Sequence, residues 1–336
     1  MVAETVLPFV SVVIPIRNEA RFIADTLDSL VAQDYPPDRL EVIVADGMSD
    51  DGTREIVLAH AAKYPRIRLI DNPERVTPNG LNRAITAARG EFISRVDGHC
   101  RVSPDFVRQN VRLFTEHPEA WVVGGPMVHE GQGPIGRAAA VAMSHPLGVG
   151  MAKHRFVDFE GYVDTVQFPA FRRWVFDRIG TFDTSLIRTE DDELNYRVVQ
   201  AGGKLFVSPR VRYVYYVRNR VRDLFRQYFQ YSFWRIPVMR KHGKLTTLRQ
   251  IVPLLFFIAV LVLAAAGAWL HAPLVALVGV AVSLVATTGV VVACLSAYVI
   301  TTMHLAYAGG MAYGLCAFML GLPAWQRDGR MSALTR

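Results

Sequence analysis

The sequence predicts an α/β domain with a doubly wound, mostly parallel sheet, followed by a basic interface helix and a small α-helical transmembrane domain. Over the first 130 residues, apolar β-branched runs alternate with segments of helical period, which is typical of parallel sheets covered by helices. A basic block follows, and from Ile251 to Leu322 the chain then has no Asp, Glu, Lys or Arg. Because a spanning helix needs about 20 apolar residues, this stretch is long enough for roughly three passes.

Short apolar runs predict the strands of the first part. The run "VSVVIPI" (10–16) has the β-branched composition of a strand that is buried on both faces. The other expected strands cover residues 40–46, 67–71, 91–97 and 120–125. Apolar residues at helical spacing predict helices over residues 19–33, 52–63, 78–88, 104–117, 172–180 and 190–203. Gly and Pro punctuate residues 131–161, where we expect a mobile loop over the ligand site.

Charge changes sharply along the chain. Residues 1–203 carry 22 Lys and Arg against 28 Asp and Glu, whereas residues 204–250 carry 12 Lys and Arg against a single Asp. A basic block just before an apolar stretch places the preceding residues in the cytoplasm by the positive-inside rule. Residues 219–242 mix aromatic side chains with many Arg, which predicts a helix in the membrane interface; a basic surface helix of the α/β domain is the alternative.

These patterns divide the chain into four parts. We expect an α/β domain over residues 1–215, basic amphipathic interface helices over 216–250, transmembrane helices over 251–322 and a tail over 323–336. The expected spans are residues 251–270, 273–297 and 303–322, with a poorly marked boundary between the second and the third. Three spans would put the C-terminus outside, whereas the arginines of the tail favour the cytoplasm. The expected location is the inner or plasma membrane, with several passes and a cytoplasmic α/β domain.

Composition also excludes some classes of protein. The three cysteines show no paired spacing, which fits a reducing compartment. The net charge is +7, but the basic residues gather at the expected membrane boundary and no nucleic-acid motif accompanies them. We therefore expect the lipid bilayer as a partner and no nucleic acid.

Polar residues stand where the expected strands end, and this is where parallel sheets bind ligands. Asp46 ends the second strand and could accept hydrogen bonds from a base or ribose, or only cap the next turn. Asp97 and His99 follow the fourth strand and could hold a cation that bridges two phosphates. The segment "TEDDE" (189–193) places four carboxylates at a helix start. Their mutual repulsion would raise some pKa values, which makes one of them a candidate general base.

Six segments carry a resemblance to a known family. In order over about residues 8–210 they are "VVIPIRNE", "VIVADGMSDDGT", "GLNRAI", "GEFISRVDGH", "FRRWVFDRIGTFD" and "EDDELNYRVVQAGG". This series resembles family 2 glycosyltransferases of the GT-A fold, in particular the succinoglycan-type, ExoA-like exopolysaccharide enzymes with a C-terminal membrane domain. The resemblance implies a Rossmann-like GT-A domain and an inverting transfer, in which a cation stabilises the departing diphosphate.

The resemblance also implies roles for single residues. The general base falls on Asp191, with Glu190 in support. The family's Asp-x-Asp metal motif falls on Asp97 and His99. The residues that would bind the nucleotide sugar are Pro15, Arg17, Glu19, Asp46, Asn82, Arg95 and Asp97.

His99 departs from the family motif, which has a second carboxylate at this position. Imidazole is an acceptable ligand for Mn²⁺ but a poorer one for Mg²⁺, which prefers oxygen. His99 would therefore ligate Mn²⁺, or hold a phosphate or a water-bridged ion, or leave the protein only weakly dependent on metal. We expect a divalent cation as cofactor, and Mn²⁺ rather than Mg²⁺.

The C-terminal half supplies most of the candidate acceptor contacts. Processive membrane synthases of the wider family carry a Gln-x-x-Arg-Trp element on an interface helix. Here Gln230, Trp234 and Arg235 occur in a different order and spacing. We take these three residues and Arg172 as candidate contacts to the acceptor or its diphosphate. A cytoplasmic domain beside a basic block suits a polyprenyl-diphosphate-linked sugar, whose diphosphate needs cationic partners.

Together these features predict a membrane-anchored, inverting glycosyltransferase. It would move a hexose from a UDP-sugar, by resemblance UDP-glucose, to a hydroxyl of a polyprenyl-diphosphate-linked saccharide. Its pathway would be exopolysaccharide or cell-wall glycan assembly, with other assembly proteins as further partners. The alternatives are direct transfer to polyprenyl phosphate, and a catalytically degenerate membrane scaffold in which His99 replaces an essential ligand.

Overall fold

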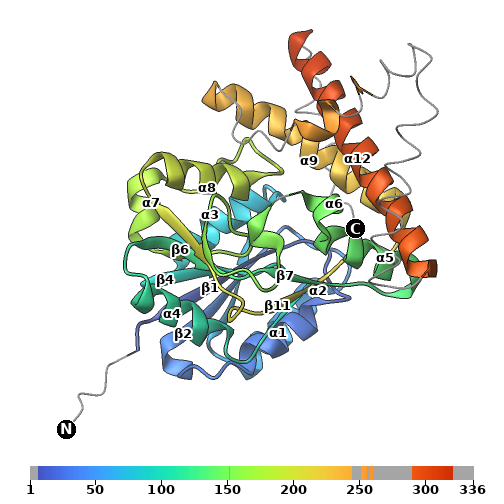
Figure 1. Ribbon diagram of the computed structural model, residues 1–336. Coiled ribbons are helices and arrows are strands. Elements are labelled where there is room, and N and C mark those ends of the chain that lie inside the picture. The colour runs from blue at the N-terminus through green and yellow to red at the C-terminus, as the bar shows by residue number, and fades with distance from the viewer. Residues whose placement is uncertain (1–6, 151, 244–250, 256–257, 260–289, 321–336) are drawn as a thin grey trace. The chain divides into compact units, whose positions relative to one another are not determined.

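The structure is a computed structural model that describes residues 7–150, 152–243, 251–255, 258–259 and 290–320. The chain divides into two compact units. Unit 1 comprises Met1–Val128 and Lys153–Tyr215, and unit 2 comprises His129–Ala152 and Tyr216–Arg336. Figure 1 labels the elements of both units.

Unit 1 is built on an eight-stranded sheet with the strand order β3-β2-β1-β4-β9-β6-β10-β8. Its strands are β1 (Val10–Ile16), β2 (Leu40–Asp46), β3 (Ile67–Asp71), β4 (Phe92–Arg95), β6 (Ala120–Gly124), β8 (Gly161–Val163), β9 (Ala170–Arg172) and β10 (Lys204–Val207). A second sheet joins β5 (Cys100–Val102), β11 (Tyr213–Tyr216) and β7 (Met127–Glu130) in that order.

Helices cover both faces of the large sheet. They are α1 (Ile23–Val31), α2 (Thr53–Lys63), α3 (Thr77–Ala87), α4 (Phe106–Glu116), α7 (Trp174–Ile179) and α8 (Glu190–Gln200), with short 3-10 turns at Pro37–Arg39 and Lys153–Arg155. Figure 1 shows α3, α7 and α8 on one side of the sheet and α1, α2 and α4 on the other. This arrangement confirms the predicted doubly wound α/β architecture.

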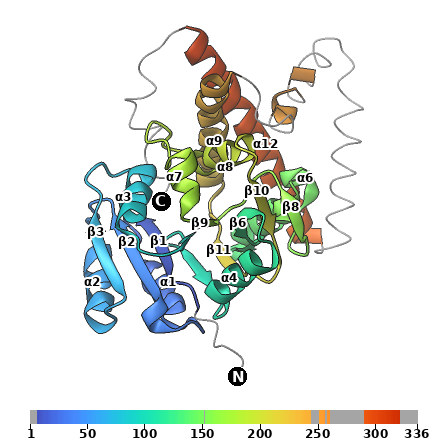
Figure 2. The same cartoon turned by 90° about the vertical axis from the view of Figure 1, so that its left-hand side faces the viewer.

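The first half of the sheet is parallel, as predicted. β1 pairs in parallel with β2 and with β4, and β2 pairs in parallel with β3; Figure 2 shows β3, β2 and β1 side by side. Val12, Val13 and Ile14 are all buried, because helices cover both faces of β1. The chain passes from β1 through α1 to β2 and through α2 to β3, and it then returns through α3 to β4 on the other side of β1. Because each crossover is right-handed, this change of direction places α3 on the face of the sheet opposite to α1 and α2.

The second half of the sheet is mixed. β9 lies between β4 and β6 and runs antiparallel to both, while β10 is parallel to β6 and antiparallel to β8. The helix expected over residues 172–180 is therefore wrong at its start. Arg172 ends a strand, and α7 begins only at Trp174.

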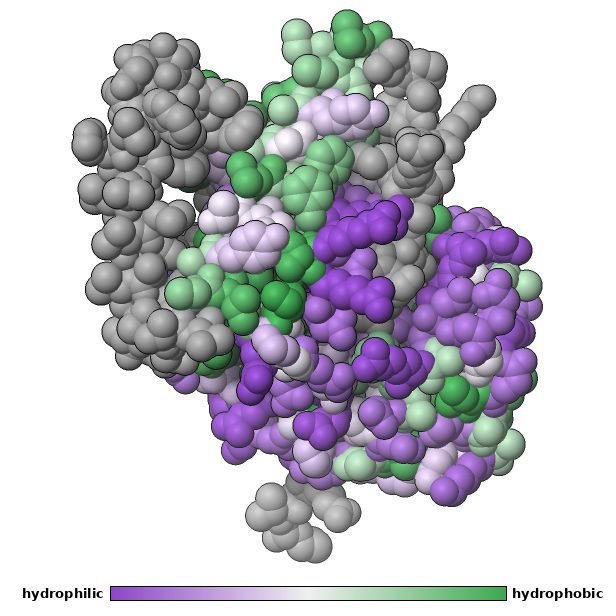
Figure 3. All heavy atoms as spheres, turned by 90° about the vertical axis from the view of Figure 1, so that its right-hand side faces the viewer, coloured by the Kyte–Doolittle hydropathy of each residue, from purple (hydrophilic) through white to green (hydrophobic). Residues whose placement is uncertain are grey.

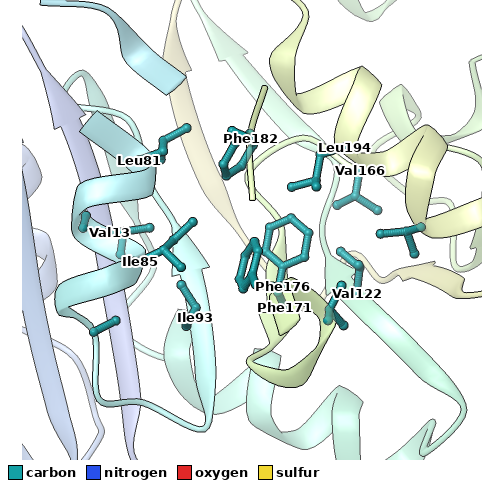
Figure 4. Packing of buried hydrophobic residues seen from close by; sticks show 14 of the residues in the cluster. Val13, Leu81, Ile85, Ile93, Val122, Val166, Phe171, Phe176, Phe182 and Leu194 are labelled. Atoms are coloured by element: carbon teal, nitrogen blue, oxygen red, sulfur yellow. The ribbon is translucent and has the colours of Figure 1, made fainter. Parts of the chain in front are cut away.

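One hydrophobic cluster joins this sheet to α3, α7 and α8 (Figure 4). Ile93 of β4 and Leu194 of α8 belong to it, together with Phe171 of β9 and Phe176 of α7. The cluster holds α8 against the face of the sheet to which Ile93 points. It thereby determines where the first turn of α8 lies relative to the end of β4.

Unit 2 contains the helices α5 (Gly133–Ser144), α6 (Pro146–Val149), α9 (Val221–His242) and α12 (Val290–Met319). α12 packs against α9, α5 and α6. The approach to α9 is close, because a Cβ atom on Gly310 would lie 2.2 Å from the carbonyl oxygen of Phe229. Small residues on α12 are therefore what allows the two helices to pack.

Some expectations for this part of the chain need correction. The loop expected over residues 131–161 contains α5, because "GPIGRAAAVAMS" has a proline in the first turn and a run of Ala. α9 confirms the helix predicted over 219–242. The spans expected at 251–270 and 273–297 fall largely outside the described residues. α12 continues unbroken through residues 298–302, where two separate spans are predicted.

Large apolar side chains are exposed on α12. Tyr298, Leu305 and Tyr313 are 56%, 48% and 49% exposed. Figure 3 shows hydrophobic residues gathered in one region of the face turned to the viewer and hydrophilic residues in another. Within the described part of the chain, no helix combines the length and the hydropathy needed to cross a membrane.

Candidate active site

The carboxyl ends of the parallel strands bring most of the predicted polar residues to one edge of the sheet. Ile16 lies beside Asp46 in the β1–β2 ladder, and Val13 lies beside Arg95 in the β1–β4 ladder. Residues that follow β1, β2 and β4 in the sequence therefore meet at this edge. The resulting site lies within unit 1.

The loop after β1 is held by the loop before α2. Asn18 Nδ2 donates a hydrogen bond to Asp50 Oδ1 over 2.9 Å, and the backbone N of Asp50 donates to Asn18 Oδ1 over 3.1 Å. The backbone N of Glu19 donates to Thr53 Oγ1 over 2.8 Å. Asn18 has a φ of 56°, a left-handed conformation that Asn tolerates better than most residues. The predicted donor-binding segment 15–19 is thus fixed in place by its neighbour.

Asp46 is completely buried, and protein groups already bind its carboxylate. Its oxygens accept hydrogen bonds from the backbone N and the hydroxyl of Ser49, and Oδ2 accepts one from Arg54 Nη1 over 2.8 Å. Arg54 Nη1 also lies 2.9 Å from Asp71 Oδ1, so one guanidinium joins the ends of β2 and β3. Asp46 thus has the turn-capping contact that the sequence offers as one alternative, and its contact with the donor stays a prediction. Arg54 is 30% exposed and was missed, since only the fold shows that it lies between two strand ends.

Gly98 allows the residues after β4 to approach the end of β1. A Cβ atom at this position would lie 2.7 Å from Ile16 Cγ2 and 3.2 Å from Glu19 Cγ. His99 Nδ1 lies 3.0 Å from Glu19 Oε1, and the His99 ring packs edge-on against Tyr215. Glu19, predicted to bind the donor, and His99, predicted to bind the metal, are therefore in direct contact.

Arg95 connects the end of β4 with the start of α8. Its Nε lies 3.2 Å from Asp97 Oδ1, and its Nη1 lies 3.1 Å from Glu190 Oε1. Because side chains alternate along a strand, Arg95 points to the same face as Ile93, which shares a hydrophobic cluster with Leu194 of α8. Glu190 precedes Leu194 by one helical turn and lies on the same side of α8. The core contact therefore brings the guanidinium and the carboxylate together.

Glu190 and Asp191, at the start of α8, hold their protons more tightly than usual. Burial raises the pKa of Glu190 to about 7; Arg95 opposes this effect and Asp191 adds to it. Burial also raises the pKa of Asp191, with a further contribution from Asp192, and Arg95 again opposes it. Burial disfavours the charge on Arg95, but Asp97, Glu190 and Asp191 together raise its pKa above the usual value. Carboxylates with raised pKa values are suited to general base catalysis.

The acidic residues of the first turn differ in their contacts. Glu190 pairs with Arg95, and Asp192 Oδ1 accepts a hydrogen bond from Thr165 Oγ1 over 2.9 Å. Asp191 Oδ1 accepts one from the backbone N of Asp192 over 2.8 Å. Thr189, just before the helix, has a φ of 62°, which is uncommon for a β-branched residue and of a kind that clusters at functional sites. Glu193 pairs with Arg197. Among the described residues, Asp191 is therefore the first-turn carboxylate with neither an ion pair nor a hydroxyl hydrogen bond, although Arg95 acts on it electrostatically.

Asp97 has the chemistry of a ligand for a divalent cation. Its side chain is 20% exposed, and carboxylate oxygen suits Mg²⁺ and Mn²⁺. His99 is engaged with Glu19 through Nδ1. In the part of the chain that the structure describes, no three His, Cys, Asp or Glu side chains form a metal site.

Two predicted site residues have structural contacts instead. Arg172 lies beside Phe92 at the start of β4, the opposite end of that strand from Arg95. Its guanidinium donates hydrogen bonds to the carbonyl oxygens of Phe114, Pro118 and Ala120. Asn82 exchanges two hydrogen bonds with the backbone of Phe182, over 2.8 and 2.9 Å. Arg172 and Asn82 thus have structural contacts, and their predicted acceptor and donor contacts stay predictions.

The remaining acceptor candidates belong to unit 2. Gln230 and Trp234 lie on α9 and are 2% and 1% exposed, and Trp234 packs edge-on against Phe233. Arg235 follows on the same helix. Burial on this scale indicates a packing role for Trp234, and the acceptor contact stays a prediction.

Comparison with known proteins identifies the family of the chain. The model of the family described as "Glycosyl transferase family 2" matches residues 11–180. The succinoglycan biosynthesis protein ExoA of Rhizobium meliloti (strain 1021) is 32% identical over 250 residues, which are 72% of this chain and 74% of that protein. A dolichyl N-acetyl-α-D-glucosaminyl phosphate 3-β-D-2,3-diacetamido-2,3-dideoxy-β-D-glucuronosyltransferase of Methanococcus voltae is 28% identical over 244 residues, covering 69% and 74%.

Solved structures show the same fold. The mannosyltransferase PcManGT from Pyrobaculum calidifontis, in complex with GDP-Man and Mn²⁺, superposes with a TM-score of 0.65 at 22% identity over 93% of this chain and 88% of that chain. S. aureus TarS residues 1–349, in complex with UDP, superposes with a TM-score of 0.51 at 16% identity, covering 93% and 92%. The mixed α/β fold is therefore GT-A-like.

Proposed function

The chain belongs to glycosyl transferase family 2 and is a glycosyltransferase, and from this premise we propose the reaction that it catalyses. It transfers a hexose from a UDP-sugar, with UDP-glucose as the first candidate, to a hydroxyl of a polyprenyl-diphosphate-linked saccharide. The transfer inverts the anomeric carbon and serves exopolysaccharide or cell-wall glycan assembly.

The convergence of Asp97, Arg95 and Glu190 at one sheet edge, with Asp191 beside them, is the observation that carries this proposal. In the proposed reaction the carboxylate of Asp191 takes the proton from the acceptor hydroxyl, and the hydroxyl oxygen attacks the anomeric carbon in line with the departing diphosphate. The raised pKa of Asp191 supports this role, because proton transfer is most efficient when the pKa of the base approaches the working pH. Direct transfer to a polyprenyl phosphate needs little base catalysis. The presence of a candidate base at Asp191 therefore favours a hydroxyl acceptor.

A divalent cation is part of the proposal. Asp97 would hold it, and the ion would supply positive charge to the diphosphate as that group departs. We favour Mn²⁺ over Mg²⁺ because Mn²⁺ also accepts an imidazole, should His99 join Asp97. The complex of PcManGT with GDP-Man and Mn²⁺ supports a cation in a protein of this fold.

The lipid-linked acceptor and the membrane location rest on a different set of features. The names of the two relatives refer to succinoglycan biosynthesis and to a dolichyl phosphate-linked sugar. The basic block over 204–250 and the exposed apolar side chains of α12 suit an anionic, membrane-bound substrate. We therefore propose that the protein works at the cytoplasmic face of the cell membrane.

Turnover of defined substrates tests the proposal. We would measure nucleoside diphosphate release from UDP-glucose, UDP-galactose and GDP-mannose, with a polyprenyl-diphosphate-linked sugar or bare polyprenyl phosphate as acceptor, with and without Mn²⁺. Asp191→Asn should lose about 10²–10⁴-fold in kcat. Asp192→Asn is the matched control, because that carboxylate binds Thr165 and should be dispensable for the chemistry. Full turnover by Asp191→Asn would show that Asp191 is not the base. NMR of the product would show whether the configuration at the anomeric carbon is inverted.

A further inference from the structure

The guanidinium of Arg95 lies between carboxylates that come from two different elements. Asp97 belongs to the segment after β4, whereas Glu190 begins α8, and the two residues are 93 positions apart in the numbering. The side chains of Arg95 and Glu190 are only 9% and 7% exposed. Ion pairs with so little water contact depend on exact geometry, because solvent does not screen or replace them.

The backbone of Arg95 is fixed as well as its side chain. Its N donates a hydrogen bond to the carbonyl oxygen of Pro169 over 2.9 Å, next to the β4–β9 pair. Besides Arg95, the charged groups that act on Glu190 are Asp191 and Arg188. Among the described residues, Arg95 is the cation that lies within ion-pairing distance of both Asp97 and Glu190.

We propose that Arg95 is a positioning residue that ties the donor side of the active site to its base side. Nε donates a hydrogen bond to Asp97, where the diphosphate and its cation would bind, and Nη1 holds Glu190 by an ion pair over 3.1 Å, so that Glu190 in turn sets the position of Asp191. This proposal rests on the proposed function and deepens it. It also changes the role of Arg95 from the donor contact that the resemblance implied to a link between carboxylates.

The shape of the guanidinium is essential to this role. A guanidinium offers several N–H groups in one rigid plane, so it can serve two carboxylates at once, whereas the ammonium of Lys is a single point charge. Without a cation between them, Asp97, Glu190 and Asp191 would repel one another in a poorly hydrated site. The carboxylates would then move apart, and a displacement of about 1 Å can reduce turnover about 100-fold.

A double-mutant cycle tests the tie in the full chain, with the best donor and acceptor pair from the turnover screen. Arg95→Met and Glu190→Gln should each lower kcat about 100-fold, and the double variant should lose hardly more than either single variant. Arg95→Lys should fold normally yet stay at least about tenfold below the wild type in kcat. Arg95→Met should also raise the Mn²⁺ concentration for half-maximal activity, because Asp97 loses its partner. Arg173→Met is the control, since it removes a guanidinium that donates a hydrogen bond to the carbonyl oxygen of Ala88, near the start of β4: it should lower Tm and leave kcat close to that of the wild type.

Several results would overturn the tie. Full activity of Arg95→Lys would show that charge alone suffices, and losses that multiply in the double variant would show that Arg95 and Glu190 act independently. The same cycle in Tm does not depend on turnover: Arg95→Met should cost less stability in the Glu190→Gln background than in the wild type. If the wild type transfers no sugar from any donor, the proposed function fails while the Tm cycle still decides the tie.

Discussion

Glu190→Gln should make the protein more stable at neutral and alkaline pH, although it removes a charged partner of Arg95. Glu190 is 5% exposed, and burial raises its pKa from the usual 4.5 to about 7. Gln has nearly the shape of the protonated Glu side chain but never ionises. The substitution therefore removes the cost of burying a negative charge and keeps the packing.

The sign and size of the effect follow from proton linkage. Between pH 4.5 and about 7 the folded state keeps a proton on Glu190 that the unfolded chain has released, so raising the pH through this window lowers the stability of the wild type. The shift from 4.5 to about 7 corresponds to about 3 kcal/mol above the window, at about 1.4 kcal/mol per pKa unit. For a domain of 150–250 residues each kcal/mol changes Tm by about 2–4 °C, so the difference in Tm should approach about 6–12 °C.

Thermal unfolding of purified protein at pH 5, 6, 7 and 8, followed by intrinsic fluorescence, measures this difference. The two proteins should have similar Tm values at pH 5 and separate as pH rises, with Glu190→Gln the more stable. Glu74→Gln is the control: its carboxylate forms a surface pair with Arg83, and its pKa is lowered, so this variant should follow the wild type across the range. Parallel curves for the wild type and Glu190→Gln, or a variant that becomes relatively less stable as pH rises, would refute the reasoning.

Two further predictions concern positions where the fold leaves little freedom. Gly98→Ala should lower stability by about 1–3 kcal/mol through overpacking against Ile16 and Glu19, and should reduce kcat about 100-fold by displacing the neighbouring carboxylate; unchanged kinetics would mean that the loop adapts. Asn82→Ala should lower stability by about 1–3 kcal/mol, because the backbone of Phe182 loses both hydrogen bonds, while the KM for the donor stays constant. A raised donor KM at unchanged Tm would restore the donor contact that the resemblance implied.

The local sequence pattern was sufficient to predict the strands in the parallel half of the sheet. The strands expected at 10–16, 40–46 and 67–71 match β1, β2 and β3 residue for residue, because β-branched apolar runs bounded by polar turns have one favourable solution in a covered sheet. β9 and β10 were missed. β9 has only three residues, and its partners β4 and β6 lie far away in the sequence. No periodic pattern in the local sequence therefore predicts this strand.

The same contrast applies to the site. Asp97 and the carboxylates at the start of α8 were predicted as site residues because they stand at a strand end and a helix start, and the family resemblance then selected Asp191 and Glu190 among the four. Their connection through Arg95 could not be predicted, since it depends on how β4 and α8 share a core. Arg172 shows the reverse case: its motif was recognised, but the antiparallel direction of β9 carries it to the far end of β4.

The exchange of hydrogen bonds between Asn18 and Asp50 has a consequence for evolution and for engineering. The Asn18 amide takes part in both hydrogen bonds, whereas Asp50 supplies one carboxylate acceptor and one backbone donor, so a change at position 18 loses both bonds and a change at position 50 loses one unless the other position changes to match. Homologous sequences should accordingly show covariation between these two sites, although 31 residues separate them in the chain. A donor loop transplanted from a relative in order to change sugar preference would need residues 49–53 of the same relative to keep its conformation.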